Sequence, residues 1–197
     1  MTKSVLQQTG DNGLLTPAPI LRLVRQFVGD PIPLDPCTTE ANPTGAARTY
    51  TQDRDGLGEP WIPGTFWNPP FGAAKRGGPS QCYAWAAKAR EEARGGAWSV
   101  GLLPCDTGRQ SSRAWHEHVL CPEMACYAVL LGRTRFDRLV DGERVVGGGG
   151  RAPTYTTGLY LYVDTSDGIA RVLSDRLARR FFDVFSDAGA VMGPRIR

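Results

Sequence analysis

Apolar side chains recur at helical spacing early in the chain. Thr16 and Pro17 precede apolar residues that lie three or four positions apart, and Gly29 ends the pattern. A hydroxyl residue followed by proline is typical of a helix start, and glycine is typical of a helix end. The pattern therefore predicts a helix that starts at Thr16 and stops before Gly29. Its apolar positions are Ile20, Leu23, Val24 and Phe27.

Two further helices follow from the same reasoning. Ser80 can cap a helix that runs to about Arg94, where Gly95 and Gly96 end it. A last helix near the end of the chain carries one apolar stripe. The stripe consists of Ile169, Val172, Leu173, Leu177, Phe181 and Val184. A short helix is also expected over residues 109–121.

Short apolar runs between the helices predict β-strands. They cover residues 31–35, 65–67, 97–103, 125–131 and 159–163. Strands that alternate with helices favour an α/β fold with a layered sheet. Residues 37–63 form a long irregular stretch, and a loop of that length inside a compact domain is usually functional.

Length and composition are those of one folded domain. The chain has 197 residues, of which 41% are hydrophobic and 22% charged. Residues 1–15 are polar and unpatterned, so we expect a flexible arm followed by a single domain over residues 16–197. No apolar stretch is long enough to cross a membrane, and the N-terminus shows no signal-peptide core. Five cysteines without a Cys-x-x-Cys pair favour reduced thiols, and a cytoplasmic protein is expected.

The residues that point to chemistry are Asn68-Pro69-Pro70-Phe71, directly after a predicted strand. Open α/β sheets bind ligands at the carboxyl ends of their strands. The Asn68 side chain and the Pro69 backbone each supply a carbonyl acceptor, and the two prolines stiffen the turn. With the flat face of Phe71 beside them, these acceptors are complementary to an exocyclic amine on a planar ring. The alternative is a proline-rich structural turn with a capping asparagine.

The motif resembles the Asp/Asn/Ser-Pro-Pro-Tyr/Phe/Trp signature of S-adenosylmethionine-dependent methyltransferases that act on amino groups. Other segments follow the order of the phage-type (Dam-like) DNA adenine N6-methyltransferases, and the resemblance covers about residues 14–137. These segments are Thr16-Pro17, Leu34-Asp35-Pro36-Cys37, Asp55-Gly56-Leu57, Trp61, Asn68–Gly72, Leu102-Leu103-Pro104 and Gly132–Phe136. The resemblance implies a Rossmann-like fold, with a mostly parallel central sheet flanked by helices and one antiparallel strand near residues 159–163.

The activity that the resemblance implies is methyl transfer from S-adenosylmethionine to the N6 amine of an adenine in double-stranded DNA. Asn68 and Pro69 would accept hydrogen bonds from the amine and stabilise the positive charge that develops on its nitrogen. Pro70 would keep the turn rigid, and Phe71 would stack on a base that has swung out of the helix. Asn68 would also contact the cofactor.

The same resemblance places the methionine end of the cofactor next to the first predicted strand. Asp35 ends that strand, and Pro36 and Cys37 stand where a glycine-rich loop is more usual. Asp35 would interact with the cationic end of the cofactor, directly or through the backbone of Pro36 and Cys37. The alternative is that Asp35 only caps a turn.

Other cofactor contacts are implied on both sides of this segment. Asp53 or Asp55, next to Leu57, would bind the ribose hydroxyls or the adenosine amine. Thr16 and Pro17 would contact the carboxylate end of the cofactor. As alternatives, the two acids are solvated turn residues and Thr16 is a plain helix cap.

Basic residues provide a candidate surface for DNA. The formal net charge is +3, and the chain has 20 arginines and 3 lysines; arginine binds phosphate through its planar guanidinium group. Residues 137–157 are the candidate insertion for reading the target sequence. Scattered solvated arginines are the alternative. The expected phosphate contacts are Lys75, Arg76, Arg109, Arg113, Arg133, Arg135 and Arg151.

Two other functions remain open. A methyltransferase acting on a protein glutamine amide would use the same four motif residues, and a catalytically silent DNA-binding phage protein would keep the fold alone. A zinc site is disfavoured because its four candidate ligands lack a standard spacing, so no metal is expected. Those candidates are His116, His118, Cys121 and Cys126. The expected assembly is a monomer or weak dimer.

Overall fold

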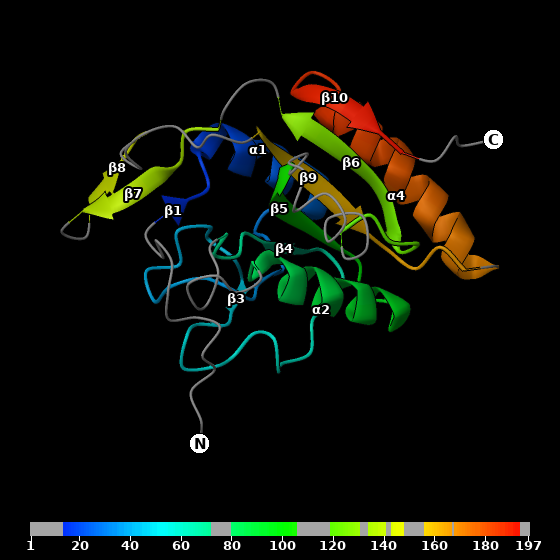
Figure 1. Cartoon of the computed structure of the whole chain (residues 1–197), viewed down its shortest axis with the longest axis horizontal. Helices are drawn as coiled ribbons and strands as arrows, with labels where there is room; N and C mark the ends of the chain where they lie inside the picture. Colours follow the sequence, from blue (N-terminus) through cyan, green and yellow to red (C-terminus); the bar gives the residue numbers. More distant parts are fainter. Residues whose placement is uncertain are drawn as a thin grey trace.

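The computed structural model describes residues 14–71, 80–105, 119–130, 134–140, 143–147, 156–166 and 168–193. Within them the helices are α1 (Ala18–Val28), α2 (Cys82–Arg94) and α4 (Ile169–Phe185). The strands are β1 (Leu14–Leu15), β2 (Leu34–Asp35), β3 (Arg48–Thr49), β4 (Thr65–Trp67), β5 (Ser99–Cys105), β6 (Met124–Leu130), β7 (Asp137–Val140), β8 (Glu143–Val145), β9 (Thr156–Tyr162) and β10 (Gly189–Met192). They form a five-stranded, a three-stranded and a two-stranded sheet (Figure 1).

The five-stranded sheet is mixed, and most of its neighbouring strands are antiparallel. Its order is β10-β6-β9-β5-β4, in which only β4 and β5 are parallel neighbours. β9 is antiparallel to both β5 and β6, and β10 is antiparallel to β6. The predicted Rossmann-like fold with a single, mostly parallel sheet is therefore wrong. Apolar runs locate strands, but strand direction depends on pairing between segments that lie far apart in the chain.

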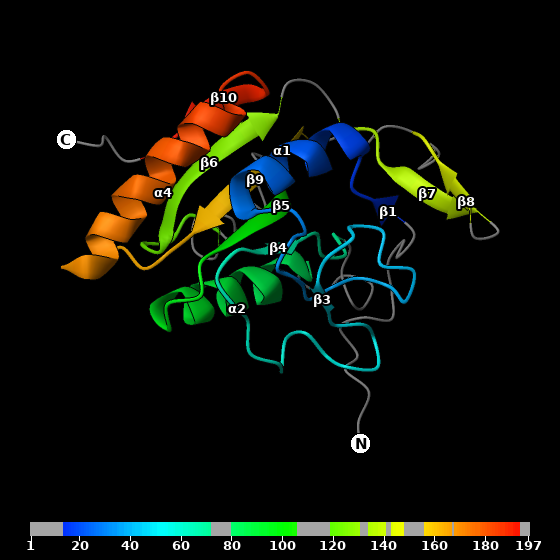
Figure 2. The same ribbon diagram turned by 180° about the vertical axis from the view of Figure 1, so that it is seen from behind.

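Different helices cover the two faces of this sheet. α1 and α4 pack on one face (Figure 2). There the rings of Phe27 and Phe181 meet edge to face with centroids 5.3 Å apart. α2 packs on the other face around Trp61, Trp67 and Trp85. The ring centroids of Trp61 and Trp85 lie 6.1 Å apart in a stacked arrangement. The molecule therefore has an apolar core on each side of the sheet.

The helices lie where the apolar spacing predicts them, but their first turns differ from the prediction. The N-cap of α1 is Pro17, and Thr16 uses its side chain elsewhere. The N-cap of α2 is Gln81, while the Ser80 hydroxyl accepts a hydrogen bond from the Cys82 backbone at 3.3 Å. The alternative in which Thr16 serves only as a helix cap is thereby removed.

The buried face of α4 begins later than its apolar stripe predicts. Leu177 and Phe181 are buried as expected. Ile169 and Val172, in contrast, are 89% and 69% exposed. Leu173 is 40% exposed as well, so the stripe is wrong from Ile169 to Leu173. Apolar spacing shows a face of the helix and not how far the core extends along it.

A β-hairpin lies at one end of the molecule, away from α4 (Figure 1). β7 pairs with β8 on one side and with β1 on the other, both antiparallel. The last two residues of the predicted arm are therefore β1, and residues 1–13 lie outside the described residues. The hairpin forms the start of the predicted insertion, residues 137–157. Residues 141–142 and 148–155 of this insertion lie outside the described residues. Residues 109–118 of the expected short helix lie outside them as well. Among the described helices, none has the length and apolar character needed to span a membrane.

Candidate functional site

A cavity of about 350 Å³ lies between the first strands of the chain. β2 lies against β4, so the residue that ends β2 and the residues that follow β4 share one cavity wall. The predicted site residues on this wall are Thr16, Asp35, Cys37, Asp53, Asn68, Pro69, Pro70 and Phe71. The predicted cofactor residues that are not on the wall are Pro17, Pro36, Asp55 and Leu57.

Asn68 is held by the strand before it and by Thr16. Trp67, the last residue of β4, is fully buried, and its Nε1 donates to Ser99 Oγ at 3.2 Å. Gly101 on β5 leaves room for the Trp67 ring, because a Cβ at position 101 would overlap that ring. Asn68 Nδ2 donates to Thr16 Oγ1 at 3.0 Å. The carboxamide oxygen of Asn68 is therefore the atom that remains to accept a hydrogen bond from a ligand.

The backbone carbonyls of the motif differ in their partners. The Phe71 carbonyl accepts a hydrogen bond from Ser80 Oγ at 2.8 Å, and the Pro70 carbonyl accepts one from a cysteine thiol at 3.8 Å. Within the described part of the chain, no group donates to the Pro69 carbonyl or to the Asn68 carboxamide oxygen. The sequence assigned the Asn68 carboxamide oxygen and the Pro69 carbonyl as acceptors for an amine. These are the two motif oxygens that remain available to a ligand.

Aromatic side chains form the apolar part of the wall. The ring of Phe71 packs against the edge of Phe136, with centroids 5.6 Å apart and an interplanar angle of 76°.

Arg135, next to Phe136 in the chain, is exposed. Of the predicted phosphate contacts, Arg135 is the one that the structure describes. Lys75, Arg76, Arg109, Arg113, Arg133 and Arg151 lie outside the described residues.

Asp35 is a carboxylate with 4% of its surface exposed. Its Oδ1 accepts a hydrogen bond from the Cys37 backbone N–H at 3.1 Å, and its Oδ2 accepts one from the Thr44 hydroxyl at 2.8 Å. Burial raises the pKa of Asp35 from 3.8 to about 6, although these hydrogen bonds partly oppose the rise by stabilising the charged form. At neutral pH the cavity therefore holds a desolvated negative charge, which favours a cationic ligand. Asp35 caps its own turn and also lines the cavity, and its role in cofactor binding stays a prediction.

The thiols near the site are neutral. Burial raises the pKa of Cys37 well above its usual value, so this side chain is not a thiolate nucleophile. In the described part of the chain, no group of three or more His, Cys, Asp or Glu side chains is arranged to hold a metal ion. His116 and His118, two of the four zinc candidates, lie outside the described residues.

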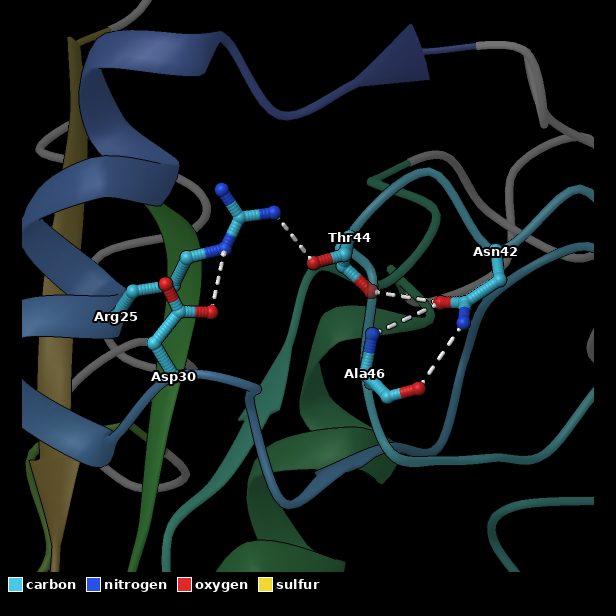
Figure 3. Close-up of polar contacts among 5 residues, drawn as sticks. All are labelled: Arg25, Asp30, Asn42, Thr44 and Ala46. Atoms are coloured by element: carbon cyan, nitrogen blue, oxygen red, sulfur yellow. Dashed lines mark hydrogen bonds and ion pairs between the residues drawn. The ribbon is translucent and has the colours of Figure 1, made fainter.

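Thr44 belongs to a loop that the sequence analysis did not include in the site. Figure 3 shows how this loop is held. Asn42 Nδ2 donates to the Ala46 carbonyl and Asn42 Oδ1 accepts from the Ala46 N–H, both at 3.0 Å. Arg25 of α1 donates to the Thr44 carbonyl at 2.9 Å. An Asn-Pro dipeptide signals a turn here, but nothing local in the sequence connects Thr44 with Asp35.

The structure distinguishes the two acids that the sequence could not. Asp53 is exposed and lies on the cavity wall. Asp55 instead accepts a hydrogen bond from the Leu57 backbone N–H at 3.1 Å, so its carboxylate stabilises its own turn. Gly56 lies so close to the segment after β2 that a Cβ at this position would overlap the Pro36 carbonyl oxygen. The two predicted cofactor segments are therefore in contact.

Two buried polar atoms on the cavity wall were missed by the sequence analysis. Thr39 Oγ1 and Trp85 Nε1 are inaccessible to solvent and have no hydrogen-bond partner among the described residues. A buried polar group without a partner destabilises a protein, and a bound ligand can supply that partner. Both residues line the cavity, but the two atoms are closed off from solvent, so a ligand reaches them only if neighbouring groups move.

No protein-family model matches this chain, and no curated protein matches it in sequence. The function is therefore inferred from the chemistry of the cavity. That chemistry consists of two carbonyl acceptors beside an aromatic ring, with a buried carboxylate on the same wall.

Proposed function

We propose that this protein is an S-adenosylmethionine-dependent methyltransferase that methylates the N6 amine of adenine in DNA. The observation that carries the proposal is that the acceptor pair of Asn68 and Pro69 shares one cavity wall with Asp35. An amine requires acceptors, and a sulfonium compound is favoured by negative charge. A cavity of about 350 Å³ is of a size that binds small molecules.

The acceptor pair addresses the main chemical difficulty of the reaction. An adenine amine attacks poorly because its lone pair is delocalised into the ring. Hydrogen bonds from its two N–H groups to Asn68 Oδ1 and the Pro69 carbonyl favour a pyramidal, more nucleophilic nitrogen. They also stabilise the positive charge that develops on that nitrogen. The ring of Phe71 provides a face on which the base can stack, and a strong base is not needed if the proton leaves after transfer.

The residues present fit the proposed cofactor. S-adenosylmethionine supplies an electrophilic methyl group on a positively charged sulfur. Asp35 offers a buried carboxylate to its positive charges, and Asp53 offers an exposed one to its hydroxyls or amine. The Thr16 hydroxyl accepts a hydrogen bond from Asn68, and its own proton remains to donate to the cofactor carboxylate.

DNA is the proposed substrate because its adenine amines fit the acceptor pair and its phosphates fit the nearby positive charge. The amine is paired inside a duplex, so the base must swing out to enter the cavity. Arg135 is exposed and adjoins Phe136 of the cavity wall, which supports a phosphate contact at that place. The formal net charge of +3 is compatible with a polyanion.

The test is a transfer assay with the full chain, S-adenosylmethionine carrying a tritiated methyl group, and a DNA duplex containing adenine. We expect label in the DNA, recovered as N6-methyladenine after digestion to nucleosides. A parallel reaction contains a protein extract in place of DNA. Label in protein alone would instead indicate the glutamine amide activity, and no transfer to either substrate would overturn the proposal.

Asn68→Ala separates catalysis from folding. Loss of one acceptor should lower the transfer rate at least about 100-fold, as does removal of a single donor from an oxyanion hole. Cofactor affinity, measured by calorimetry, should stay within a few-fold of the wild-type value because Asp35 is unchanged. If cofactor affinity falls as much as the rate, Asn68 has a structural role and the proposed mechanism is wrong.

A further inference from the structure

We propose that Arg144, on the β7–β8 hairpin, is a positioning residue that orients the Asn68 carboxamide through Thr16. The inference rests on the proposed function where it concerns methyl transfer and DNA. Its structural part stands on contacts among described residues, and it assigns the hairpin a role in the reaction besides any direct contact with substrate.

The contacts form a continuous path from the hairpin to the motif. Arg144 Nη2 donates to the Thr16 backbone carbonyl at 2.7 Å. Asn68 Nδ2 donates to the hydroxyl of the same threonine at 3.0 Å. Thr16 is thus held at its backbone by the hairpin and at its side chain by the motif. A shift of Thr16 would move the oxygen to which the Asn68 amide is bonded.

Arg144 is itself fixed. Its Nε donates to Asp137 Oδ2 at 2.8 Å, and the Asp137 side chain is only 3% exposed. Asp137 Oδ1 accepts a hydrogen bond from the Gly147 N–H at 2.9 Å, on the far side of β8. A charged pair that is mostly buried and hydrogen-bonded holds its geometry well. The guanidinium group therefore meets Thr16 in a defined position.

The hairpin also fixes the position of the backbone before Thr16, because β1 pairs with β7. Leu14 lies opposite Arg138 and Leu15 opposite Asp137. Leu14 and Leu15 lie on the cavity wall together with Thr16. A change in the hairpin is thus transmitted to Thr16 by strand pairing as well as by Arg144.

The hairpin is placed to sense a substrate outside the cavity. It lies at one end of the molecule (Figures 1 and 2), and Val146 next to β8 is 84% exposed. A duplex resting against the hairpin would act on β7 and β8 directly. Its binding would reach the Asn68 carboxamide by way of Arg144 and Thr16, so target engagement and alignment of the amine acceptor would be linked.

The functional test compares two arginines that each donate a hydrogen bond to a backbone carbonyl. Arg144→Met should lower kcat about tenfold, since changes along such a path alter coupling by about 2- to 30-fold. Cofactor affinity should be unchanged, and Arg144→Lys should restore part of the rate. The control is Arg180→Met: Arg180 Nη2 also donates to a backbone carbonyl, that of Gln26 at 3.0 Å, but Gln26, unlike Thr16, is not on the cavity wall. An unchanged kcat in Arg144→Met, or an equal loss in Arg180→Met, would overturn the inference.

A second test does not depend on activity. The chain has three asparagines, Asn12, Asn42 and Asn68, so selective ¹⁵N-asparagine labelling gives three side-chain amide signals. The Asn68 signal is assigned by its disappearance in Asn68→Asp. It should shift or broaden in Arg144→Met and in Arg144→Lys, but not in Arg180→Met.

The Asn42 signal is an internal reference in this second test, because its Nδ2 bonds to the Ala46 carbonyl in a different loop. A shift of Asn68 with Asn42 unmoved supports the inference, whereas equal shifts of both, or no shift of Asn68, would overturn it. If the wild-type protein transfers no methyl group but the Asn68 signal still responds to Arg144, the proposed function fails and the positioning contact stands.

Discussion

Among single residues, Asp35 combines burial with charge. A carboxylate with 4% exposure loses most of its hydration, and burial raises the pKa of Asp35 to about 6. Between pH 3.8 and 6 the folded protein therefore binds a proton that the unfolded chain has released. The contribution of Asp35 to stability is fully favourable below pH 3.8 and is lost as the pH rises through 6. Above pH 6 the empty site retains an unfavourable charge that a cationic ligand would stabilise.

Asp35→Asn should remove this pH dependence. The variant should be more stable than the wild type above pH 6, by roughly 2–3 kcal/mol, and the difference should shrink as the pH falls toward 4. Urea unfolding of both proteins from pH 4 to pH 8, without ligand, measures it; groups that titrate in both proteins cancel in the comparison. Parallel stability curves would show that Asp35 is not desolvated. Binding of S-adenosylmethionine should weaken in the same variant.

Residue chemistry could be predicted only where it is carried by a short motif. The positions of Asp35 and Asn68 on a common wall agree with the sequence analysis, because each follows a short apolar run. The choice between Asp53 and Asp55 could not be made, since it depends on which carboxylate bonds to its own turn. Thr44 was missed because its contact with Asp35 arises from the path of the whole loop.

At the scale of elements, the loop around Asn42 shows how one side chain shapes a stretch of irregular backbone. Asn42 has a φ of 44°, in the left-handed region that asparagine tolerates better than most residues. Its side chain bonds to both backbone groups of Ala46 (Figure 3). The loop presents Thr44 to Asp35. Local order in this loop is therefore a condition for the hydrogen bond at Asp35.

Asn42→Ala should destabilise the protein by about 2 kcal/mol, because it removes these hydrogen bonds and places a β-carbon in left-handed backbone. Asn42→Asp keeps the acceptor and tolerates the backbone, so its cost should be smaller, about 1 kcal/mol. Urea midpoints at pH 7 provide the measurement. Equal effects of the two substitutions would mean that the side-chain bonds to Ala46 contribute little.

Helices were more predictable than sheets for a physical reason. The limits of α1 and α2 depend on proline, glycine and capping residues within a few positions, and these signals are local. The direction of β9 and β10 depends on partners more than 25 residues away, as when Leu159 pairs with Leu102. The exposed start of α4 likewise depends on where the sheet ends. Neither property is encoded in apolar spacing.

At the scale of the whole molecule, both apolar cores reach the cavity, the first through Phe136 and the second through Trp85, whereas other parts of the first core lie away from it. The core under α1 and α4 contains Phe181, which is fully buried and is not on the cavity wall. The core under α2 contains Trp85, which is fully buried and is part of that wall. Phe181 is thus separated from the ligand, and its replacement should affect folding without affecting ligand binding.

Two adjacent phenylalanines test this separation. Phe181→Ala should cost roughly 3–5 kcal/mol of unfolding free energy, because it opens a space among packed rings. Phe182→Ala should cost less than about 1 kcal/mol, since Phe182 is 43% exposed. Cofactor affinity, measured at a temperature where both variants are folded, should match the wild type. A large loss of affinity in Phe181→Ala would show that the two cores are coupled.

The place of β9 in the sheet has a consequence for how the protein is made. β9 comes from residues 156–162, yet it lies between β5 and β6, which leave the ribosome well before it. A nascent chain that ends before residue 156 therefore carries two apolar strands that lack their common neighbour. Unpaired strand edges of this kind are prone to aggregate. The growing polypeptide must be shielded, by a chaperone or by rapid translation, until its middle strand has been synthesised.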